Sequence, residues 1–280
     1  MKFLVKISIK LKILIIFIKM IKILIINRSK HVTNDILKSI VKAIDMLGKI
    51  MAKSWHVMFP EIEIATSAEN GQWNFFIVDE TYDNDGNVLA YHMDQNNNIS
   101  GIIYAGRILR DGGCVVNAYD NVKSDGKPDI IYDNKAQALF KKCTSISRAL
   151  CHEIFETIID PSCNSLWNTG SINMFGYGMS YVAEVCDPVE DNNVVVHCDG
   201  FDIYLSDFVY PAWKDRTNSQ GPFNFRDTLS KPFSIDDGGY ITTSDDRIIT
   251  AMKKKPNFKH KVRYQKRMYK YESTKSICLY

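Results

Sequence analysis

The sequence lacks several of the local patterns that identify a common chemistry. Its seven cysteines form no C-x-x-C pair, and their odd number does not suit a set of disulfides. They are therefore expected to be reduced thiols of an intracellular protein. No G-x-G-x-x-G or Walker sequence is present, so dinucleotide and P-loop nucleotide binding have no local signature. A Ser–His–Asp triad has none either, and no internal repeat is found.

The first 26 residues consist mainly of Ile, Leu and Lys. Lysines interrupt the apolar run throughout, so no lysine-free stretch reaches the roughly 20 residues that span a bilayer. No small-residue cleavage site follows, which argues against a removable signal peptide. Two interpretations stay open. Residues 1–26 are either a membrane contact, as a signal anchor or a surface helix, or a non-native extension translated upstream of the true start.

Acidic residues are nearly missing from both ends of the chain. Residues 1–30 hold eight Lys or Arg and no acid, and residues 251–280 hold ten, with Glu272 as the single acid. Of the 35 basic and 32 acidic residues of the chain, 17 and 31 therefore fall in residues 31–250, a net charge of −14 there. On this basis the chain divides into a hydrophobic and basic N-terminal segment (1–30), an acidic globular domain (31–250) and a basic tail (251–280).

The basic tail interleaves its Lys and Arg residues with Phe258, Tyr264, Tyr269 and Tyr271 and contains few aliphatic side chains. This composition is typical of a disordered segment. Basic side chains bind a phosphate backbone and aromatic rings stack on bases, so weak, non-specific nucleic-acid binding is expected. The same composition also suits anionic lipid, the acidic body of the protein itself, or a solvated tail that aids solubility.

Residues 144–161 are the most informative stretch, because they predict one helix with both ends marked. Thr144 or Ser145 can cap its N-terminus. Pro161 ends it, and the proline disfavours helical geometry at Asp160. Apolar residues recur at every fourth position of this helix, namely Ile146, Leu150, Ile154 and Ile158. One face of the helix is therefore expected to be buried.

The same helix carries the sequence H-E-x-x-E. His152 and Glu156 are four residues apart and project from one face, while Glu153 borders the apolar side. Burying a carboxylate without a partner is costly, so a divalent metal is expected to compensate these groups. The alternative is a helix that exposes one surface histidine and two solvated acids.

H-E-x-x-E is a one-residue variant of H-E-x-x-H. In that motif the first and last residues bind zinc, and the Glu after the first His is the general base. His152 and Glu156 are therefore candidate metal ligands, and Glu153 is the candidate catalytic base. Zn²⁺ is the expected metal, with a harder ion such as Mn²⁺ as the alternative, because Glu156 supplies a carboxylate in place of an imidazole.

The surrounding patterns predict an α+β fold. An amphipathic helix is expected over residues 34–53. Strands are expected at residues 62–66, 73–78, 88–93, 99–108, 194–198, 203–205 and 208–209. Residues 136–142 either begin the H-E-x-x-E helix or form a short helix before it. Loops are expected over 170–178 and 216–240.

Three motifs in order resemble a known family. Residues 152–161 read H-E-I-F-E-T-I-I-D-P, residues 184–190 read E-V-C-D-P-V-E and residues 205–213 read L-S-D-F-V-Y-P-A-W. They are similar to S-H-E-V-L-E-M-L-V-D-P, E-V-x-D-P-V-E and V-S-[DN]-F-V-x-P-A-W of a zincin-like, that is metallopeptidase-like, family of bacterial, phage and large-virus proteins. That family also has a strand ending in G-Y-H-D, which residues 89–94 resemble with a Met inserted before Asp94. The resemblance covers about residues 60–215.

The resemblance implies a zincin-like fold, in which a mixed sheet packs on the 34–53 helix and the H-E-x-x-E helix. It also implies a third metal ligand from beyond that helix. Glu184 fits this role if residues 181–190 begin as a helical turn, with Asp187 orienting a ligand. The alternative ligands are Asp160, Asp187 and Glu190, with His197 as a weaker one.

Other residues receive roles through the same resemblance. His92 is expected on the strand edge that binds extended peptide in zincins, or as a hydrogen-bonded core histidine. Tyr181 or Tyr210 is a candidate to stabilise an oxyanion. The expected function is metal-dependent hydrolysis of a peptide or protein substrate. The alternative is a non-catalytic structural or virion-associated protein on the same fold, whose acids hold loops together. The expected location is intracellular or virion-associated, with membrane anchoring by the N-terminal segment left open.

Overall fold

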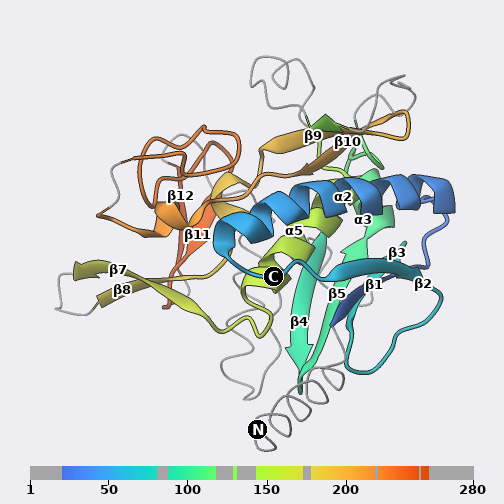
Figure 1. The fold of residues 1–280 in the computed structure, drawn as a ribbon, viewed down its shortest axis with the longest axis horizontal. Coiled ribbons are helices and arrows are strands. Elements are labelled where there is room, and N and C mark those ends of the chain that lie inside the picture. The colour runs from blue at the N-terminus through green and yellow to red at the C-terminus, as the bar shows by residue number, and fades with distance from the viewer. Residues whose placement is uncertain are drawn as a thin grey trace, which may run out of the picture.

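The computed structural model describes residues 21–80, 88–117, 129–130, 143–172, 178–217, 220–245 and 247–251 of the 280-residue chain. The predictions made for residues 1–20, for the 136–142 helix and for the basic tail beyond residue 251 lie outside the described residues. Within the described part, two helices lie between two β-sheets (Figure 1).

The larger sheet has five strands in the order β2-β1-β3-β5-β4. They are β1 (Lys22–Asn27), β2 (Glu61–Ala65), β3 (Trp73–Val78), β4 (Ala90–Gln95) and β5 (Asn98–Tyr104). β1 pairs in parallel with β2 and β3, and β3 pairs in parallel with β5. β4 runs antiparallel to β5 and forms one edge of the sheet. The sheet is therefore mixed, as predicted.

β1 comes from the part of the chain that the sequence patterns assigned to the N-terminal segment. Ile25 is fully buried and pairs with Ile64 of β2 on one side and Phe75 of β3 on the other. A parallel strand flanked on both sides is apolar on both faces, which the sequence K-I-L-I-I-N satisfies. Residues 22–27 therefore belong to the folded body, although the composition of residues 1–30 set them apart from it.

Ile25→Ala is expected to destabilise the protein by about 2–5 kcal/mol, because it leaves a cavity in the centre of the sheet. Ile21→Ala is the matched control, since Ile21 precedes the strand and is 47% exposed. Its cost should stay within about 0.5 kcal/mol. Denaturant unfolding followed by circular dichroism measures both. Equal costs for the two variants would show that β1 is not part of the cooperative core.

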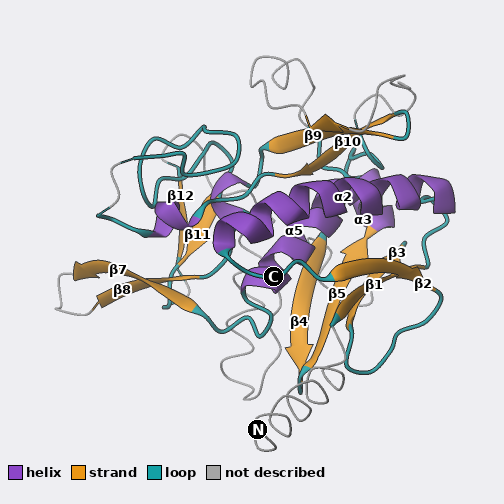
Figure 2. Ribbon diagram, viewed as in Figure 1, coloured by secondary structure: helices purple, strands orange, loops and turns teal. Residues whose placement is uncertain are grey.

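The middle layer consists of α2 (Asn34–Trp55) and α5 (Ile146–Ile159). α2 begins after Thr33, whose Oγ1 accepts a hydrogen bond from the Ile36 N–H at 3.3 Å. The second sheet is antiparallel, with the order β10-β9-β6. Its strands are β6 (Asp129–Ile130), β9 (Asn193–Cys198) and β10 (Phe201–Ser206). α5 contacts β4 and β5 on one side and β10 on the other, so it lies at the centre of the layers (Figure 2).

The α+β class and the two long helices are confirmed, and several boundaries are corrected. The predicted strand over 99–108 ends at Tyr104, and α3 (Ala105–Arg110) follows. Gly106 allows the first turn of α3 to pack closely against the Asp79 backbone, because a Cβ there would lie 2.1 Å from the Asp79 carbonyl oxygen. Of the predicted 170–178 loop, residues 170–172 and 178 instead belong to the paired strands β7 (Leu166–Ile172) and β8 (Gly178–Val182), and residues 173–177 lie outside the described ranges.

The remaining described elements are short. They are the 3₁₀ helices η1 (Asp187–Val189) and η2 (Pro211–Lys214) and the paired strands β11 (Tyr240–Thr242) and β12 (Ile248–Thr250). The predicted strand at 208–209 is reduced to an isolated bridge between Val209 and Asn224. None of the helices in the described ranges is long and apolar enough to cross a membrane.

The cysteines depart from the prediction in one place. Cys114 and Cys143 are joined in a disulfide, so the expectation that all seven cysteines are reduced is wrong for this pair. This disulfide could not be predicted, because the two residues are 29 positions apart and belong to no spacing motif. Among the described residues the other cysteines are buried and take part in no disulfide, namely Cys151, Cys163, Cys186 and Cys198.

Candidate metal centre

The H-E-x-x-E helix α5 is fixed at both ends. Ser145 caps its N-terminus, accepting a hydrogen bond from the Arg148 N–H at 3.0 Å. The Ser147 hydroxyl donates to the Tyr204 carbonyl of β10 at 2.7 Å. At the C-terminus, the Asp160 carboxylate accepts hydrogen bonds from the Ser165 N–H and hydroxyl at 2.9 and 3.0 Å. The helix therefore holds its polar face in one orientation, and Asp160, an alternative ligand in the sequence, ties the helix end to the next loop.

The three titratable groups of the motif are buried. His152 is 5% exposed, Glu153 0% and Glu156 1%. This overturns the alternative of a surface histidine with two solvated acids. Each glutamate also keeps one buried oxygen, Glu153 Oε1 and Glu156 Oε2, with no hydrogen-bond partner among the described residues. Buried carboxylate oxygens left in this way are costly, and a bound cation is one of the ways in which proteins compensate them.

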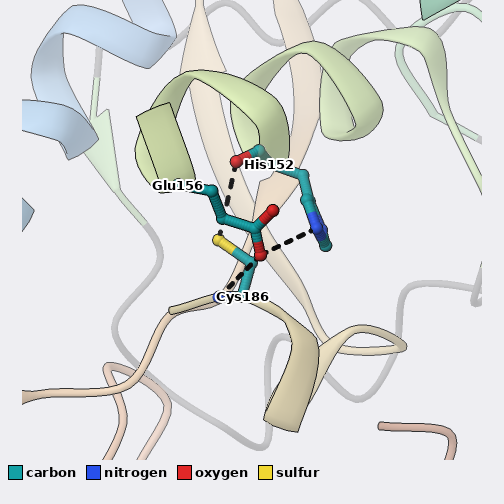
Figure 3. Close-up of side chains that lie close together, drawn as sticks. All are labelled: His152, Glu156 and Cys186. Carbon is teal, nitrogen blue, oxygen red and sulfur yellow. Dashed lines mark hydrogen bonds and ion pairs between the residues drawn. The ribbon is translucent and has the colours of Figure 1, made fainter. Parts of the chain in front are cut away.

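The first group of potential ligand atoms comes from α5 and from the segment that leads into η1. His152 Nε2 lies 3.0 Å from Glu156 Oε1 and 3.3 Å from Asp187 Oδ1. Figure 3 shows His152 and Glu156 projecting from α5 toward Cys186, whose N–H donates to Glu156 Oε1 at 3.4 Å. One ligand atom each from His152, Glu156 and Cys186 lie within 4.8 Å of one another. Tetrahedral zinc with bonds of about 2.1 Å places its ligands about 3.4 Å apart, so the donor set fits one ion after small side-chain movements.

The electrostatics of this group favour a cation. Burial by itself lowers the pKa of His152, but the nearby Glu156 and Asp187 carboxylates outweigh it and raise that pKa well above the ordinary value. Burial raises the pKa of Glu156 to about 7, helped by Asp187 and opposed by His152. Burial also raises the pKa of the Cys186 thiol well above its ordinary value. Without a metal, the group therefore holds protons tightly.

A second group of potential ligand atoms shares Glu156 with the first. His92 of β4 is buried, and its Nδ1 lies 3.1 Å from Glu153 Oε2. One ligand atom each from His92, Glu153 and Glu156 also lie within 4.8 Å of one another. His92 is thus a buried, hydrogen-bonded histidine as one of the two interpretations expected, and its partner is the candidate base.

A cavity of about 20 Å³ opens beside α5. Its lining residues are Leu89, Ala90, Thr144, Arg148, Ala149, His152, Glu153 and Glu190. This volume is enough for a single water molecule or ion. Ala90 is the first residue of the edge strand β4 and Leu89 precedes it, so the cavity lies between the start of that strand and the helix. A candidate ligand and the candidate base therefore face the same small space.

The predicted third ligand depends on local geometry that the structure does not have. β8 ends at Val182 and η1 begins at Asp187, so residues 181–184 form no helical turn. Glu184 and Asp187 are both buried, and neither belongs to the two groups found among the described residues. Asp187, an alternative in the sequence, contacts His152 directly. Cys186 was missed, because it occupies the unspecified position of the E-V-x-D-P-V-E pattern.

The other candidates have different surroundings. Glu190 lines the cavity with His152 and Glu153. His197 of β9 is paired with Asp202 of β10. Two tyrosines pack against aromatic rings, Tyr181 against Phe233 and Tyr210 against Phe208, and neither lines the cavity.

Comparisons of the chain with protein-family models, with curated proteins and with solved structures found no match. What the chain can do is therefore inferred from its motifs and from the chemistry of the site. Two buried histidines, three buried carboxylates and a buried thiol lie in this part of the fold, and the two groups that they form could hold a metal ion.

Proposed function

We propose that the protein is a metal-dependent hydrolase of peptide bonds. The observation that carries this proposal is the burial of His152 and Glu156 on consecutive turns of α5, with ligand atoms 3.0 Å apart and the candidate base Glu153 beside them. The three sequence motifs that resemble zincin-like proteins support it, because two of them, at residues 152–161 and 184–190, supply the groups that meet here.

The ligands in this proposal are His152, Glu156 and a third donor from residues 184–187. Asp187 is favoured over the predicted Glu184, because its Oδ1 lies 3.3 Å from His152 Nε2. It is also favoured over Cys186, whose pKa is raised by burial, so that its thiol gives up a proton less readily than a carboxyl group does. Zn²⁺ is the expected ion and Mn²⁺ the alternative.

A divalent cation at this position would polarise a substrate carbonyl and make a water molecule more acidic. Glu153 would take the proton of that water and return it to the leaving amine. His92 holds Glu153 Oε2 at 3.1 Å, which leaves Oε1 for this transfer. The cavity that Glu153 lines with His152 has room for one water molecule.

The edge strand β4 supports a peptide as the substrate. Among the described strands β4 pairs with β5 alone, and Leu89 and Ala90 at its start form a wall of the cavity. An extended peptide can add to such an edge through main-chain hydrogen bonds. A peptide bound there would pass close to His152 and Glu153.

The second candidate is a structural protein in which the acids of the motifs hold loops. Asp160 and Asp207 favour it. Asp160 accepts two hydrogen bonds from Ser165. Asp207 accepts hydrogen bonds from the Phe208 N–H at 2.8 Å and from the Asn224 amide at 2.7 Å. Protein that purifies without metal and keeps its stability in chelator would favour this candidate.

The metal content of purified variants tests the proposal. Wild-type protein should carry zinc at the H-E-x-x-E site, and His152→Ala should lose it. Glu156→His recreates H-E-x-x-H and should retain or tighten zinc binding, while Glu156→Ala should lose much of the affinity. Elemental analysis after dialysis measures these contents, with His197→Ala as the control because His197 pairs with Asp202 outside both groups.

The same measurement assigns the third ligand. Asp187→Ala should lower zinc affinity by at least tenfold, whereas Glu184→Gln should leave it unchanged. Weaker zinc binding in Glu184→Gln, with unchanged binding in Asp187→Ala, would instead identify Glu184 as the ligand. Equal metal content in wild type, Glu156→His and Glu156→Ala would remove Glu156 from the site.

A further inference from the structure

Glu156 belongs to both groups of ligand atoms. It lies with His152 and Cys186 in the first group and with His92 and Glu153 in the second. We infer that this cluster takes two divalent cations, with Glu156 as the carboxylate that they share. The inference rests on the proposed function for the first ion and adds a second position that the H-E-x-x-E motif does not imply.

The two oxygens of Glu156 are in different situations. Oε1 faces His152 Nε2 at 3.0 Å and accepts the Cys186 N–H at 3.4 Å. Oε2 is buried and has no hydrogen-bond partner among the described residues. If Glu156 Oε1 binds the first ion, Oε2 remains available to bind the second. Ions in two-metal sites lie about 3.5–4 Å apart, a separation that a shared carboxylate can span.

The second position has its own donors. His92 Nδ1 and Glu153 Oε2 are 3.1 Å apart, and both side chains are 1% exposed. Glu153 Oε1 is the other buried carboxylate oxygen with no hydrogen-bond partner in the described ranges. One imidazole and two carboxylates are a common protein ligand set for zinc and similar ions.

The charge of the cluster also points to more than one ion. Glu153, Glu156 and Asp187 are all buried, and together their three carboxylates carry more negative charge than one divalent cation neutralises. Histidine binds metal in its neutral form, so the histidines do not change the net charge of the cluster. A second cation beside Glu153 and Glu156 would compensate the remainder.

Filling the second position would change the chemistry of the first. Glu153 would become a ligand and could no longer accept a proton from water. In the proposed function Glu153 is the general base, so hydrolysis belongs to the form with one ion. Binding of the second ion would then inhibit hydrolysis, to a degree that depends on the concentration of free metal.

The test is a count of bound metal in the full-length protein. After removal of metal with chelator, the protein is titrated with Zn²⁺ and, in parallel, with Mn²⁺. Native mass spectrometry and elemental analysis should find about two ions per chain in the wild type and about one in His92→Ala, because two-metal sites need donors for each ion. His197→Ala is the matched histidine control and should still bind about two, since His197 lies in neither group.

A second measurement does not depend on any variant folding. Wild-type protein loaded with Mn²⁺ should give the electron paramagnetic resonance signal of a spin-coupled pair, because a shared carboxylate couples the two ions. One ion in the wild type with an uncoupled Mn²⁺ signal would overturn the second position and leave the proposed function intact. No bound ion at all would overturn both. One ion in both the wild type and His92→Ala would show that His92 does not bind metal.

Discussion

Glu153→Gln is expected to abolish peptide hydrolysis while the ion at His152 stays bound. Gln is nearly isosteric with Glu and can still hydrogen-bond His92, so the fold and the first ligands should be unaffected. It cannot accept a proton from water, and loss of a general base typically lowers the rate by about 10²–10⁴-fold. Hydrolysis of a panel of unstructured peptides, measured at one bound ion per chain, gives the effect.

The matched control is Glu190→Gln, which makes the same chemical change in the lining of the same cavity. It should retain hydrolysis and metal. Loss of the His152-site ion in Glu153→Gln would mean that Glu153 is a ligand of that ion and that its role as a base is wrong. Full activity in Glu153→Gln would place the base elsewhere.

The helices could be predicted from the sequence because their signals are local. Thr33 and Ser145 cap the N-termini of α2 and α5, which is a common role of Thr and Ser at that position. The apolar periodicity predicted both helices nearly over their full observed length. β1 could not be separated from residues 1–21 by composition. Its partners Ile64 and Phe75 lie about 40 and 50 positions further along, and only their pairing distinguishes a buried strand from a lysine-interrupted apolar run.

The site divides in the same way. His152, Glu153 and Glu156 share one helix, so their spacing alone gave their common face. The third ligand depends on the backbone conformation between the end of β8 and the start of η1. The sequence of residues 181–190 is compatible both with the predicted helical turn that begins at residue 181 and with the observed 3₁₀ turn at Asp187–Val189. The contact between His92 and Glu153 spans 61 residues and two different elements. No spacing rule reaches that far, so its partner could not be read from the sequence.

Metal affinity should fall steeply as the pH is lowered from 8 to 6. The pKa of His152 is raised well above its ordinary value, against the effect of burial, by Glu156 and Asp187, and burial raises that of Glu156 to about 7. A raised pKa means that the metal-free site binds the proton more tightly, so the ion must displace it. Each displaced proton costs about tenfold in affinity per pH unit below its pKa.

The slope of this dependence should itself change with pH. Below about pH 7, the pKa of Glu156, the ion must displace the Glu156 proton as well as the His152 proton, so the affinity should fall more steeply per pH unit there than at higher pH. Competition with a chelator of known pH dependence measures the affinity, and circular dichroism at each pH establishes that the fold persists. An affinity that stays constant between pH 8 and 6 would show that the ion does not displace these protons. His152 and Glu156 would then not be its ligands.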